Sequence, residues 1–186
     1  MNSKLQIISG QYKGRKLNLP AGARPTQNRA RIALFNMLES GIVDVNSGLK
    51  IWDAFAGSGA FGIECLSRYS NATLLFTDVL NSSIKTVRDN LALLEIGDQA
   101  SVIQADALSV ISKYASTVDI VFLDPPYSQY ELGVAFVKTF AKYAKSGAII
   151  IWEQDKEDFS LPDLGIWDIL RDKTYGRARF LIMQKK

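Results

Sequence analysis

The sequence predicts an α/β fold in which a mostly parallel sheet of seven strands is covered by helices on both faces. From residue 49 onward, short apolar runs alternate with amphipathic stretches, a pattern typical of parallel strands joined by crossover helices. After Pro162, two extended runs follow one another directly, and such a pair is expected to be antiparallel. With 186 residues, 47% of them hydrophobic, the chain can bury one core and is too apolar to be disordered.

Residues 1–46 are expected to form an extension ahead of the sheet domain. Two short extended runs around Gly10 to Gly14 indicate a β-hairpin, which Pro20 closes. A helix should follow, with Thr26 as a candidate N-cap and Gly41 at its end. Its apolar side chains recur at helical spacing: Ala30, Ala33, Leu34, Met37 and Leu38.

The sheet domain is expected over residues 47–186. Apolar runs place its parallel strands at residues 49–54, 73–77, 100–104, 119–123 and 148–152. Amphipathic spacing marks two intervening helices, one by Ile84, Val87, Leu91 and Leu94 and the other by Leu132, Phe136, Phe140 and Tyr143. The antiparallel C-terminal pair covers residues 166–170 and 178–183, with a polar turn at Gly176 between them.

Composition excludes several kinds of site. The single cysteine, Cys65, cannot form an internal disulfide, and it is expected to be a small buried side chain. With no histidine, the chain can form no His/Cys zinc site and can use no histidine base. No apolar run approaches the ~20 residues of a membrane span, and the N-terminus lacks a signal peptide. A cytoplasmic protein that does not associate with a membrane is therefore expected.

The net charge of +3 is unevenly distributed along the chain. The first 31 residues contain seven basic side chains and no acidic one. The rest of the chain holds 15 basic and 19 acidic side chains, a balance of −4. A basic arm on a mildly acidic body suggests a polyanionic partner, and an arm of merely solvated charges is the alternative.

A glycine-rich segment, from Asp53 to Gly62, lies where the first strand of the sheet turns into a helix. Gly57, Gly59 and Gly62 have the spacing of a dinucleotide-binding turn, in which the first can adopt positive φ and the second lets a ligand approach the backbone. The same spacing occurs in tight turns that bind nothing and in nicotinamide-dependent oxidoreductases. The motif alone therefore leaves the ligand open.

Acidic residues also follow the second and third strands. Asp78 comes about 20 residues after the first glycine, the position from which a carboxylate can bind ribose hydroxyls, or it can begin the next helix. Asp106 can accept a hydrogen bond from an adenine amino group, or it can cap the helix that follows. Each residue taken by itself leaves both roles open.

The fourth strand ends in Asp124, Pro125, Pro126 and Tyr127. Two prolines cannot continue a strand ladder, so the chain leaves the strand in a stiff extended turn. That turn holds a carboxylate, a backbone carbonyl and an aromatic ring in a fixed relation, which suits a planar NH2 group on a base that stacks on the ring. A rigid loop with a packed tyrosine is the alternative. Because open α/β sheets bind ligands at strand ends, the successive strand-end motifs favour a ligand site.

Together, these motifs resemble the class I S-adenosylmethionine-dependent amino-methyltransferases. The N-terminal region narrows the resemblance to the bacterial RsmD family, which methylates a guanine N2 in 16S ribosomal RNA, and the similarity covers almost the whole chain. The N-terminal segments that carry it are Ile8-Ser-Gly10, Lys13-Gly-Arg15, Arg24-Pro-Thr26 and Arg29-Ala-Arg31. The chain departs from the family at Ile32, where an acidic residue is usual. The resemblance implies a Rossmann-like methyltransferase domain with a basic, RNA-contacting extension.

By this resemblance, S-adenosylmethionine is the cofactor, S-adenosylhomocysteine is the product and no metal is needed. The residues implied to bind the cofactor are Asp53, Phe55, Ala56, Gly57, Ser58, Gly59, Asp78, Val79, Asp106 and Ala107. Those implied to act in catalysis are Asp124, Pro125, Pro126 and Tyr127. RNA contacts are assigned to Lys13, Arg15, Arg24, Thr26, Arg29, Arg31, Tyr175 and Arg177. Residues two apart point to different sides of a helix, so either Arg29 or Arg31 can instead be an internal brace.

The implied partner is 16S ribosomal RNA, the small ribosomal subunit or an assembly intermediate, and the protein is expected to be a monomer. Two other functions stay open on the residues alone. One is methylation of adenine N6 in DNA or RNA, because such enzymes share the Asp-Pro-Pro-aromatic motif. The other is nucleic-acid binding without catalysis on the same fold.

Overall fold

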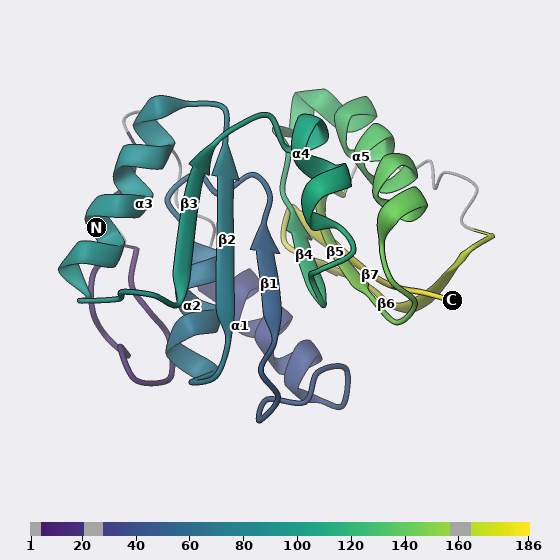
Figure 1. The fold of residues 1–186 in the computed structure, drawn as a ribbon. Helices are drawn as coiled ribbons and strands as arrows, with labels where there is room; N and C mark the ends of the chain where they lie inside the picture. The colour runs from purple at the N-terminus through teal and green to yellow at the C-terminus, as the bar shows by residue number, and fades with distance from the viewer. Residues whose placement is uncertain (1–4, 21–27, 157–164) are drawn as a thin grey trace.

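The computed structural model describes residues 5–20, 28–156 and 165–186, and within them a single sheet of seven strands forms the centre of the molecule (Figure 1). The strands are β1 (Lys50–Asp53), β2 (Thr73–Asp78), β3 (Ala100–Gln104), β4 (Ile120–Leu123), β5 (Ile149–Asp155), β6 (Trp167–Tyr175) and β7 (Ala178–Lys185). Their order across the sheet is β3-β2-β1-β4-β5-β7-β6. The first five are parallel, which confirms the predicted fold class. The direction of winding reverses between β1 and β4, where β1 leads outward to β2 and β4 leads outward to β5.

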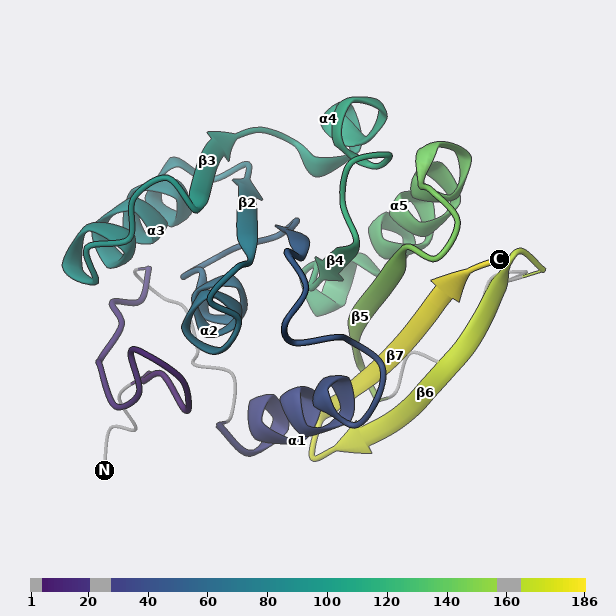
Figure 2. The ribbon, with the colours of Figure 1, turned by 60° about the horizontal axis from the view of Figure 1, so that its bottom comes forward.

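Helices cover both faces of the sheet, as predicted. They are α1 (Asn28–Glu39), α2 (Ala60–Arg68), α3 (Asn81–Leu93), α4 (Ala107–Tyr114) and α5 (Tyr130–Tyr143), with a short 3-10 turn, η1 (Tyr127–Gln129). The helices α1, α2 and α3 lie on one face, and α4 and α5 lie on the other (Figure 2). Each face has its own apolar core, the first built around Phe35, Phe61 and Phe76 and the second around Trp52, Phe136 and Trp152.

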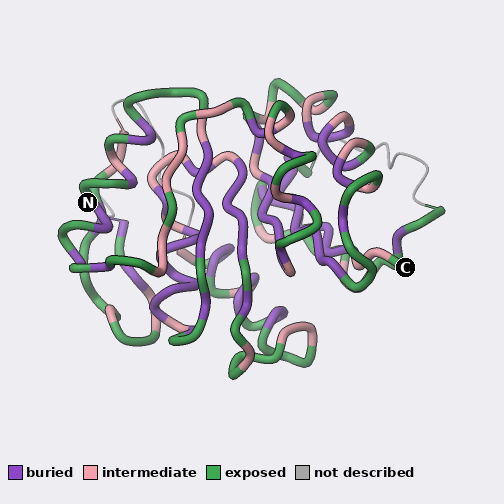
Figure 3. Tube along the Cα trace, viewed as in Figure 1, coloured by how far each residue is buried: buried purple, intermediate pink, exposed green. Residues whose placement is uncertain are grey.

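The central strands carry most of the burial. Every residue of β4 and β5 is buried, whereas the edge strand β3 is only half-buried (Figure 3). Near-continuous apolar runs such as Ile120–Leu123 suit a strand with helices on both faces, which is why the sequence pattern locates these strands well. Cys65 is buried in α2, as expected.

The C-terminal pair is antiparallel, as predicted, and β7 also pairs antiparallel with β5. The turn between its two strands passes through Gly176, which has a φ of +64°. The first strand of the pair is longer than predicted, because it continues to Tyr175 rather than ending near residue 170. Its later residues are mostly polar, since β6 is an edge strand, and a bulge between Ile169 and Arg171 shifts the register. An apolar run therefore marks only part of this strand.

The predicted N-terminal hairpin is present only in part. Within residues 5–20, regular pairing is limited to one antiparallel bridge between Gln6 and Lys16. The tip of this segment packs against α2, where the Gln11 N–H donates to the Ser67 carbonyl at 2.7 Å. A Cβ at Gly10 would lie 1.8 Å from that carbonyl oxygen, so glycine alone allows this approach. Backbone hydrogen bonds also join the two arms of this segment, so it is a short irregular hairpin whose tip bonds to α2.

Glu64 of α2 anchors the same segment. Its buried carboxylate accepts hydrogen bonds from the Ile8 N–H at 2.8 Å and from the Ser9 N–H at 3.0 Å. Arg68, one turn further along α2, donates to the same carboxylate at 2.8 Å. A charged group buried in this way is stable only because donors surround it, so Glu64 fixes where the N-terminal segment lies. The predicted N-cap of α1, Thr26, lies outside the described residues.

We expect Gly62→Ala to destabilise the fold. Gly62 lies in the first turn of α2 against β2, and a Cβ there would come within 2.2 Å of the Phe76 ring. Overpacking of this kind should lower the free energy of unfolding by about 1–3 kcal/mol, measured by urea denaturation. Gly97→Ala is the matched control, because a Cβ at Gly97 meets no atom within 4 Å. Equal losses in the two variants would contradict the packing role of Gly62.

Candidate active site

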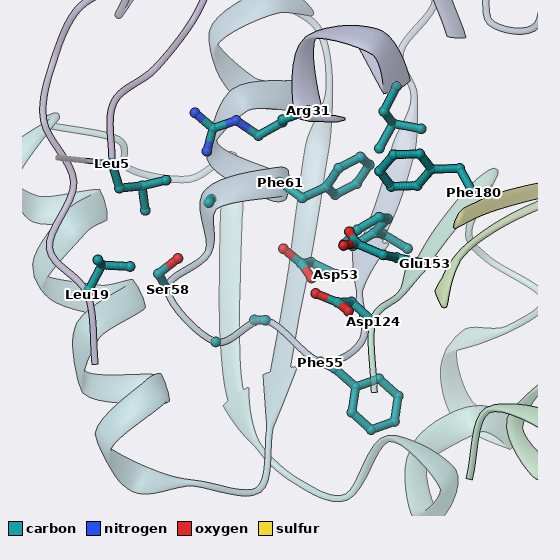
Figure 4. A pocket seen from close by; sticks show the side chains of 15 residues that line it. Leu5, Leu19, Arg31, Asp53, Phe55, Ser58, Phe61, Asp124, Glu153 and Phe180 are labelled. Carbon is teal, nitrogen blue, oxygen red and sulfur yellow. The ribbon is translucent and has the colours of Figure 1, made fainter. Parts of the chain in front are cut away.

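A pocket lies at the carboxyl ends of β1, β4 and β5, where the direction of winding reverses. This is the position at which open α/β sheets bind ligands. Three carboxyl groups line the pocket, those of Asp53, Asp124 and Glu153, together with the loop that follows β1 (Figure 4). Apolar side chains of the N-terminal segment and of β7 contribute to the same lining: Leu5, Leu19 and Phe180.

The loop after β1 is held in shape by its own hydrogen bonds. The Gly62 N–H donates to Asp53 Oδ2 at 3.1 Å, and the Gly59 N–H donates to the Ala56 carbonyl at 2.7 Å. Gly57 and Gly59 have φ angles of +54° and +76°, which favour glycine. A Cβ at Gly57 would meet no atom within 4 Å, so the backbone faces open space there. The first glycine therefore leaves the loop accessible to a ligand, while the third packs α2 onto the sheet.

Asp78 lies beside this loop at the end of β2. Its Oδ2 accepts a hydrogen bond from the Gly57 N–H at 2.9 Å, and its Oδ1 accepts one from the Leu80 N–H at 2.9 Å. The second bond forms a turn just before α3, whose N-cap is Leu80 and has no side-chain cap, and the first ties the carboxylate to the glycine loop. Val79, which follows, is 58% exposed. The end of β2 is thus open to solvent next to the loop.

Asp106 caps α4. Its side chain accepts a hydrogen bond from the Leu108 N–H at 3.0 Å, which confirms the capping role that the sequence left open. Asp106 is exposed and Ala107 is buried, and neither lines the pocket. A ligand role for these two residues remains a prediction.

The three carboxyl groups of the pocket repel one another. None of them forms an ion pair with a described residue. Burial raises the pKa of Asp53 to about 7 and that of Glu153 to about 7. Burial also raises the pKa of Asp124 well above its usual range, and the nearby charges of Glu153 and Asp53 raise it further. Near neutral pH, the three carboxyl groups are therefore not all ionised unless a cation binds beside them.

Sequence reasoning missed Glu153. The predicted fifth strand ends at residue 152, so Glu153 satisfies the same rule as the other acids, a carboxylate directly after a buried apolar strand. In the structure β5 continues to Asp155, and Glu153 is buried within it. The signal that could have found it is an acid that directly follows Ile149 to Trp152, an apolar run.

Both the hydroxyl group and the ring of Tyr127 have a partner in the structure. The hydroxyl donates to Glu153 Oε1 at 3.1 Å. The Arg177 guanidinium lies 5.3 Å from the ring centre and pairs with Asp155 Oδ2 at 2.5 Å. Burial and the nearby carboxylates raise the pKa of Tyr127, so its hydroxyl keeps its proton near neutral pH. The structure thus brings the predicted residues Tyr127 and Arg177 together.

The other predicted residue near the C-terminus is Tyr175, which is half-buried with its ring centre 6.4 Å from that of Phe180. Arg179, a neighbouring arginine on β7, is 3% exposed and pairs with Asp172 at 2.7 Å. Arg179 is therefore part of the folded sheet and is absent from the surface.

The predicted RNA-contacting residues of the N-terminal arm fall into three groups. Lys13, Arg15 and Arg29 are exposed. Arg31 is buried and donates to the Gln6 carbonyl, as an internal brace would. The remaining two, Arg24 and Thr26, lie outside the described residues.

The fold, the strand order and the strand-end site define a Rossmann-like methyltransferase of the kind that uses S-adenosylmethionine. The family described as conserved hypothetical protein 95 matches residues 5–184. The chain belongs to this family, and its resemblance to RsmD is confirmed.

Individual relatives agree with this assignment. The ribosomal RNA small subunit methyltransferase D of Escherichia coli (strain K12) is 35% identical over 191 residues, which cover 100% of this chain and 92% of that protein. The solved structure of yhhF from Escherichia coli has a TM-score of 0.80 at 33% identity and covers 98% of both chains. A precorrin-6y C5,15-methyltransferase from Geobacter metallireducens, at 17% identity, shares the fold with a TM-score of 0.64 and covers 89% of this chain and 92% of that one.

The residues present suit S-adenosylmethionine. The cofactor carries positive charge at its sulfonium sulfur, and the pocket offers Asp53 and Asp124 without a cationic partner among the described residues. The backbone at Gly57 faces open space, so a ligand can approach it closely. Asp78 lies at the neighbouring strand end, within hydrogen-bonding distance of the same glycine.

Within residues 5–20, 28–156 and 165–186, no group of three or more His, Cys, Asp or Glu side chains could hold a metal ion. None of the helices there is long and apolar enough to cross a membrane.

The raised pKa of Glu153 predicts how stability depends on pH. Its folded pKa of about 7 lies above its ordinary value of 4.5, so between these pH values the folded protein keeps a proton that the unfolded chain has lost. The stability of the wild type should therefore fall as pH rises through this window. In Glu153→Gln, the fall from pH 5 to pH 8 should be smaller by about 1–3 kcal/mol, measured by urea unfolding.

Glu131→Gln, an exposed position on α5, is the control for this measurement and should show the wild-type dependence on pH. If Glu153→Gln loses as much stability as the wild type between pH 5 and pH 8, the Glu153 carboxyl is not protonated in the folded state near neutral pH.

Proposed function

We propose that this chain transfers a methyl group from S-adenosylmethionine to the exocyclic N2 of a guanine in 16S ribosomal RNA, which by family resemblance is guanine 966. The observation that carries the proposal is Asp124, half-buried in the pocket with no hydrogen-bond donor among the described residues and followed by a rigid Pro-Pro-Tyr turn. A carboxylate held in this way is ready to accept hydrogen bonds from a substrate amine. The full-length relative from Escherichia coli, named as a ribosomal RNA small subunit methyltransferase, supports the substrate class.

Asp124 and Pro125 would orient the amine. The lone pair of guanine N2 is delocalised into the ring, which makes the nitrogen a poor nucleophile. Hydrogen bonds from its two N–H groups to the Asp124 carboxylate and the Pro125 carbonyl favour a pyramidal nitrogen aimed at the methyl group. Pro126 keeps the turn stiff, and the face of the Tyr127 ring opposite Arg177 would offer the base a stacking surface. Positioning of this kind supplies much of the rate.

When bound, S-adenosylmethionine supplies a methyl group that its sulfonium sulfur activates. The residues proposed to hold it are Asp53 and the loop Phe55, Ala56, Gly57, Ser58 and Gly59 at the methionyl end, Asp78 with Val79 at the ribose, and Asp106 with Ala107 at the adenine. No metal is part of the proposal.

The cluster of Asp53, Asp124 and Glu153 would stabilise the positive charge that develops on the amine nitrogen during methyl transfer. As N2 gains a fourth bond it becomes positive, and the negative charge of Asp124 and its neighbours stabilises that state in a buried site. The amine must then lose a proton, and Asp124, whose pKa is raised by burial, is placed to accept it.

The basic extension expected over residues 1–46 would bind RNA phosphates around the target base. Lys13, Arg15 and Arg29 are exposed for this role, and Arg177 lies over Tyr127 at the site itself. A base can reach the pocket only when it is unstacked, which favours a loop or junction of RNA over a regular duplex. The proposed partner is 16S ribosomal RNA in the small subunit or an assembly intermediate, and the proposed form of the protein is a cytoplasmic monomer.

Asp124→Asn tests the chemistry. The amide replaces an acceptor by a donor that faces the substrate amine, so methyl transfer to small-subunit RNA should fall by at least a hundredfold. Binding of S-adenosylhomocysteine, measured by calorimetry, should change little. The control is Asp168→Asn, which alters an exposed carboxylate on β6 and should keep full activity.

Mass spectrometry of nucleosides from the reacted RNA separates the alternatives. N2-methylguanosine supports the proposal, whereas N6-methyladenosine would replace it with the adenine-specific function. Wild-type protein that binds RNA and transfers no methyl group would favour a non-catalytic binding protein. Binding of NADH in place of S-adenosylhomocysteine would favour the oxidoreductase.

The salt dependence of RNA binding tests whether basic residues of the N-terminal arm contact phosphates. Each phosphate contact releases counterions, so removing one should lower the slope of log affinity against log salt by about 1. Arg29→Gln and Lys13→Gln should each show this change in a fluorescence titration. Lys142→Gln, on the exposed side of α5, should leave the slope unchanged. A wild-type slope in Arg29→Gln would show that Arg29 does not contact phosphate.

A further inference from the structure

Arg31 has a feature that RNA binding does not explain. Its side chain is 4% exposed and comes from α1, yet it lines the same pocket as Asp53 and Ser58 (Figure 4). One terminal nitrogen, Nη2, donates to the Gln6 carbonyl, and Asn28 Oδ1 lies 3.4 Å from it. The other two nitrogens of the guanidinium, Nε and Nη1, are buried and have no hydrogen-bond partner among the described residues.

Burying two donors of a guanidinium without partners lowers the stability of the fold, because these donors lose their hydrogen bonds to water and form none in the protein. Burial lowers the pKa of Arg31, and the charge of Glu64 acts against that shift. Glu64, however, already accepts hydrogen bonds from two backbone N–H groups and from Arg68. Arg31 still carries its charge near neutral pH, because an arginine does not lose its proton there. The pocket therefore has a place for an anion beside Arg31.

The rest of the pocket indicates which anion fits. Figure 4 shows the Arg31 guanidinium well apart from the Asp53 carboxylate, so the pocket has a basic end and an acidic end. The loop that ends in Ser58 and the N-terminal end of α2, where helical N–H groups have no partner within the helix, lie along the same pocket. In the methionyl part of S-adenosylmethionine, the carboxylate and the positively charged sulfonium lie several bonds apart, which matches this separation of charges.

We infer that Arg31 binds the α-carboxylate at the methionyl end of S-adenosylmethionine through its unpartnered Nη1. Nη1 carries two hydrogens and a share of the positive charge, so a carboxylate there accepts a charge-assisted hydrogen bond. The inference rests on the proposed function, since it takes the cofactor as given and names one residue that recognises it. It also separates two arginines of α1: Arg29 is exposed and available to RNA, and Arg31 faces the cofactor.

A phosphate of the RNA fits this place less well. Apolar side chains of the N-terminal segment, Leu5 and Leu19, line the same pocket as the guanidinium, so this part of the pocket does not favour a second charged group. A phosphodiester is joined to the RNA chain on both sides and would have to bring that chain into the pocket. A carboxylate at the end of a small ligand enters without this cost.

Calorimetry with three ligands tests the inference. They are S-adenosylhomocysteine, its decarboxylated form, which lacks only the carboxylate, and 5′-methylthioadenosine, which lacks the whole amino-acid end. The wild type should bind S-adenosylhomocysteine at least tenfold more tightly than the decarboxylated form. Arg31→Met should bind these two equally and should bind 5′-methylthioadenosine as the wild type does. Arg31→Lys, which keeps the charge but lacks the planar guanidinium, should show an intermediate preference.

Arg171→Met, which removes an arginine from β6, is the control and should keep the wild-type preference. A wild type that binds S-adenosylhomocysteine and its decarboxylated form equally would overturn the inference, even if the Arg31 variants fail to fold. An equal loss for all three ligands in Arg31→Met would overturn it too, because Arg31 would then act only in the fold. Weaker RNA binding with an unchanged ligand preference would assign Arg31 to RNA. A wild type that binds none of the ligands would instead refute the proposed function.

Discussion

The reversal of winding between β1 and β4 is the constraint on which the site depends. The two strands are neighbours in the sheet, but the chain leaves them toward opposite edges, so their carboxyl ends border an open crevice. In the strand register Asp53 lies opposite Phe122, and Leu123 lies opposite Trp152. The acids that end β1 and follow β4 are therefore brought together by backbone pairing alone, with no salt bridge needed to gather them.

This gathering has an electrostatic cost. Asp53, Asp124 and Glu153 share a buried site, and the raised pKa values of all three show that the folded protein resists charging them. Replacement of one acid by a neutral side chain would relieve the repulsion, so stability alone does not explain the cluster. A positively charged ligand does explain it, because it gains from the same field that destabilises the free protein. The site thus illustrates how a binding function is maintained against the preference of the fold.

Periodicity and strand ends were enough to predict the sheet, its parallel part, its antiparallel pair and four of its acidic strand ends. These features depend on local sequence, since a buried strand is a continuous apolar run wherever it lies. The partial hairpin, the burial of Arg31 and the role of Glu64 depend instead on contacts between segments more than 20 residues apart. Sequence patterning contains no signal for which backbone groups a distant carboxylate will accept. Glu153 is a different case, because its local signal was present, in an acid that directly follows an apolar run, and the predicted strand ended three residues before Asp155.

The N-terminal segment is tied to the glycine loop through one side chain. The Asn90 amide of α3 donates to the Asn18 carbonyl at 3.1 Å and to the Ser58 carbonyl at 2.9 Å, and its Oδ1 accepts from the Asn18 N–H at 2.8 Å. Asn90 is fully buried, so these bonds form away from competing water and favour one arrangement of the three segments. A ligand that orders the loop at Ser58 would therefore also order the part of the basic arm around Asn18. By the reciprocity of linked equilibria, RNA that orders the arm would strengthen binding at the loop to the same degree.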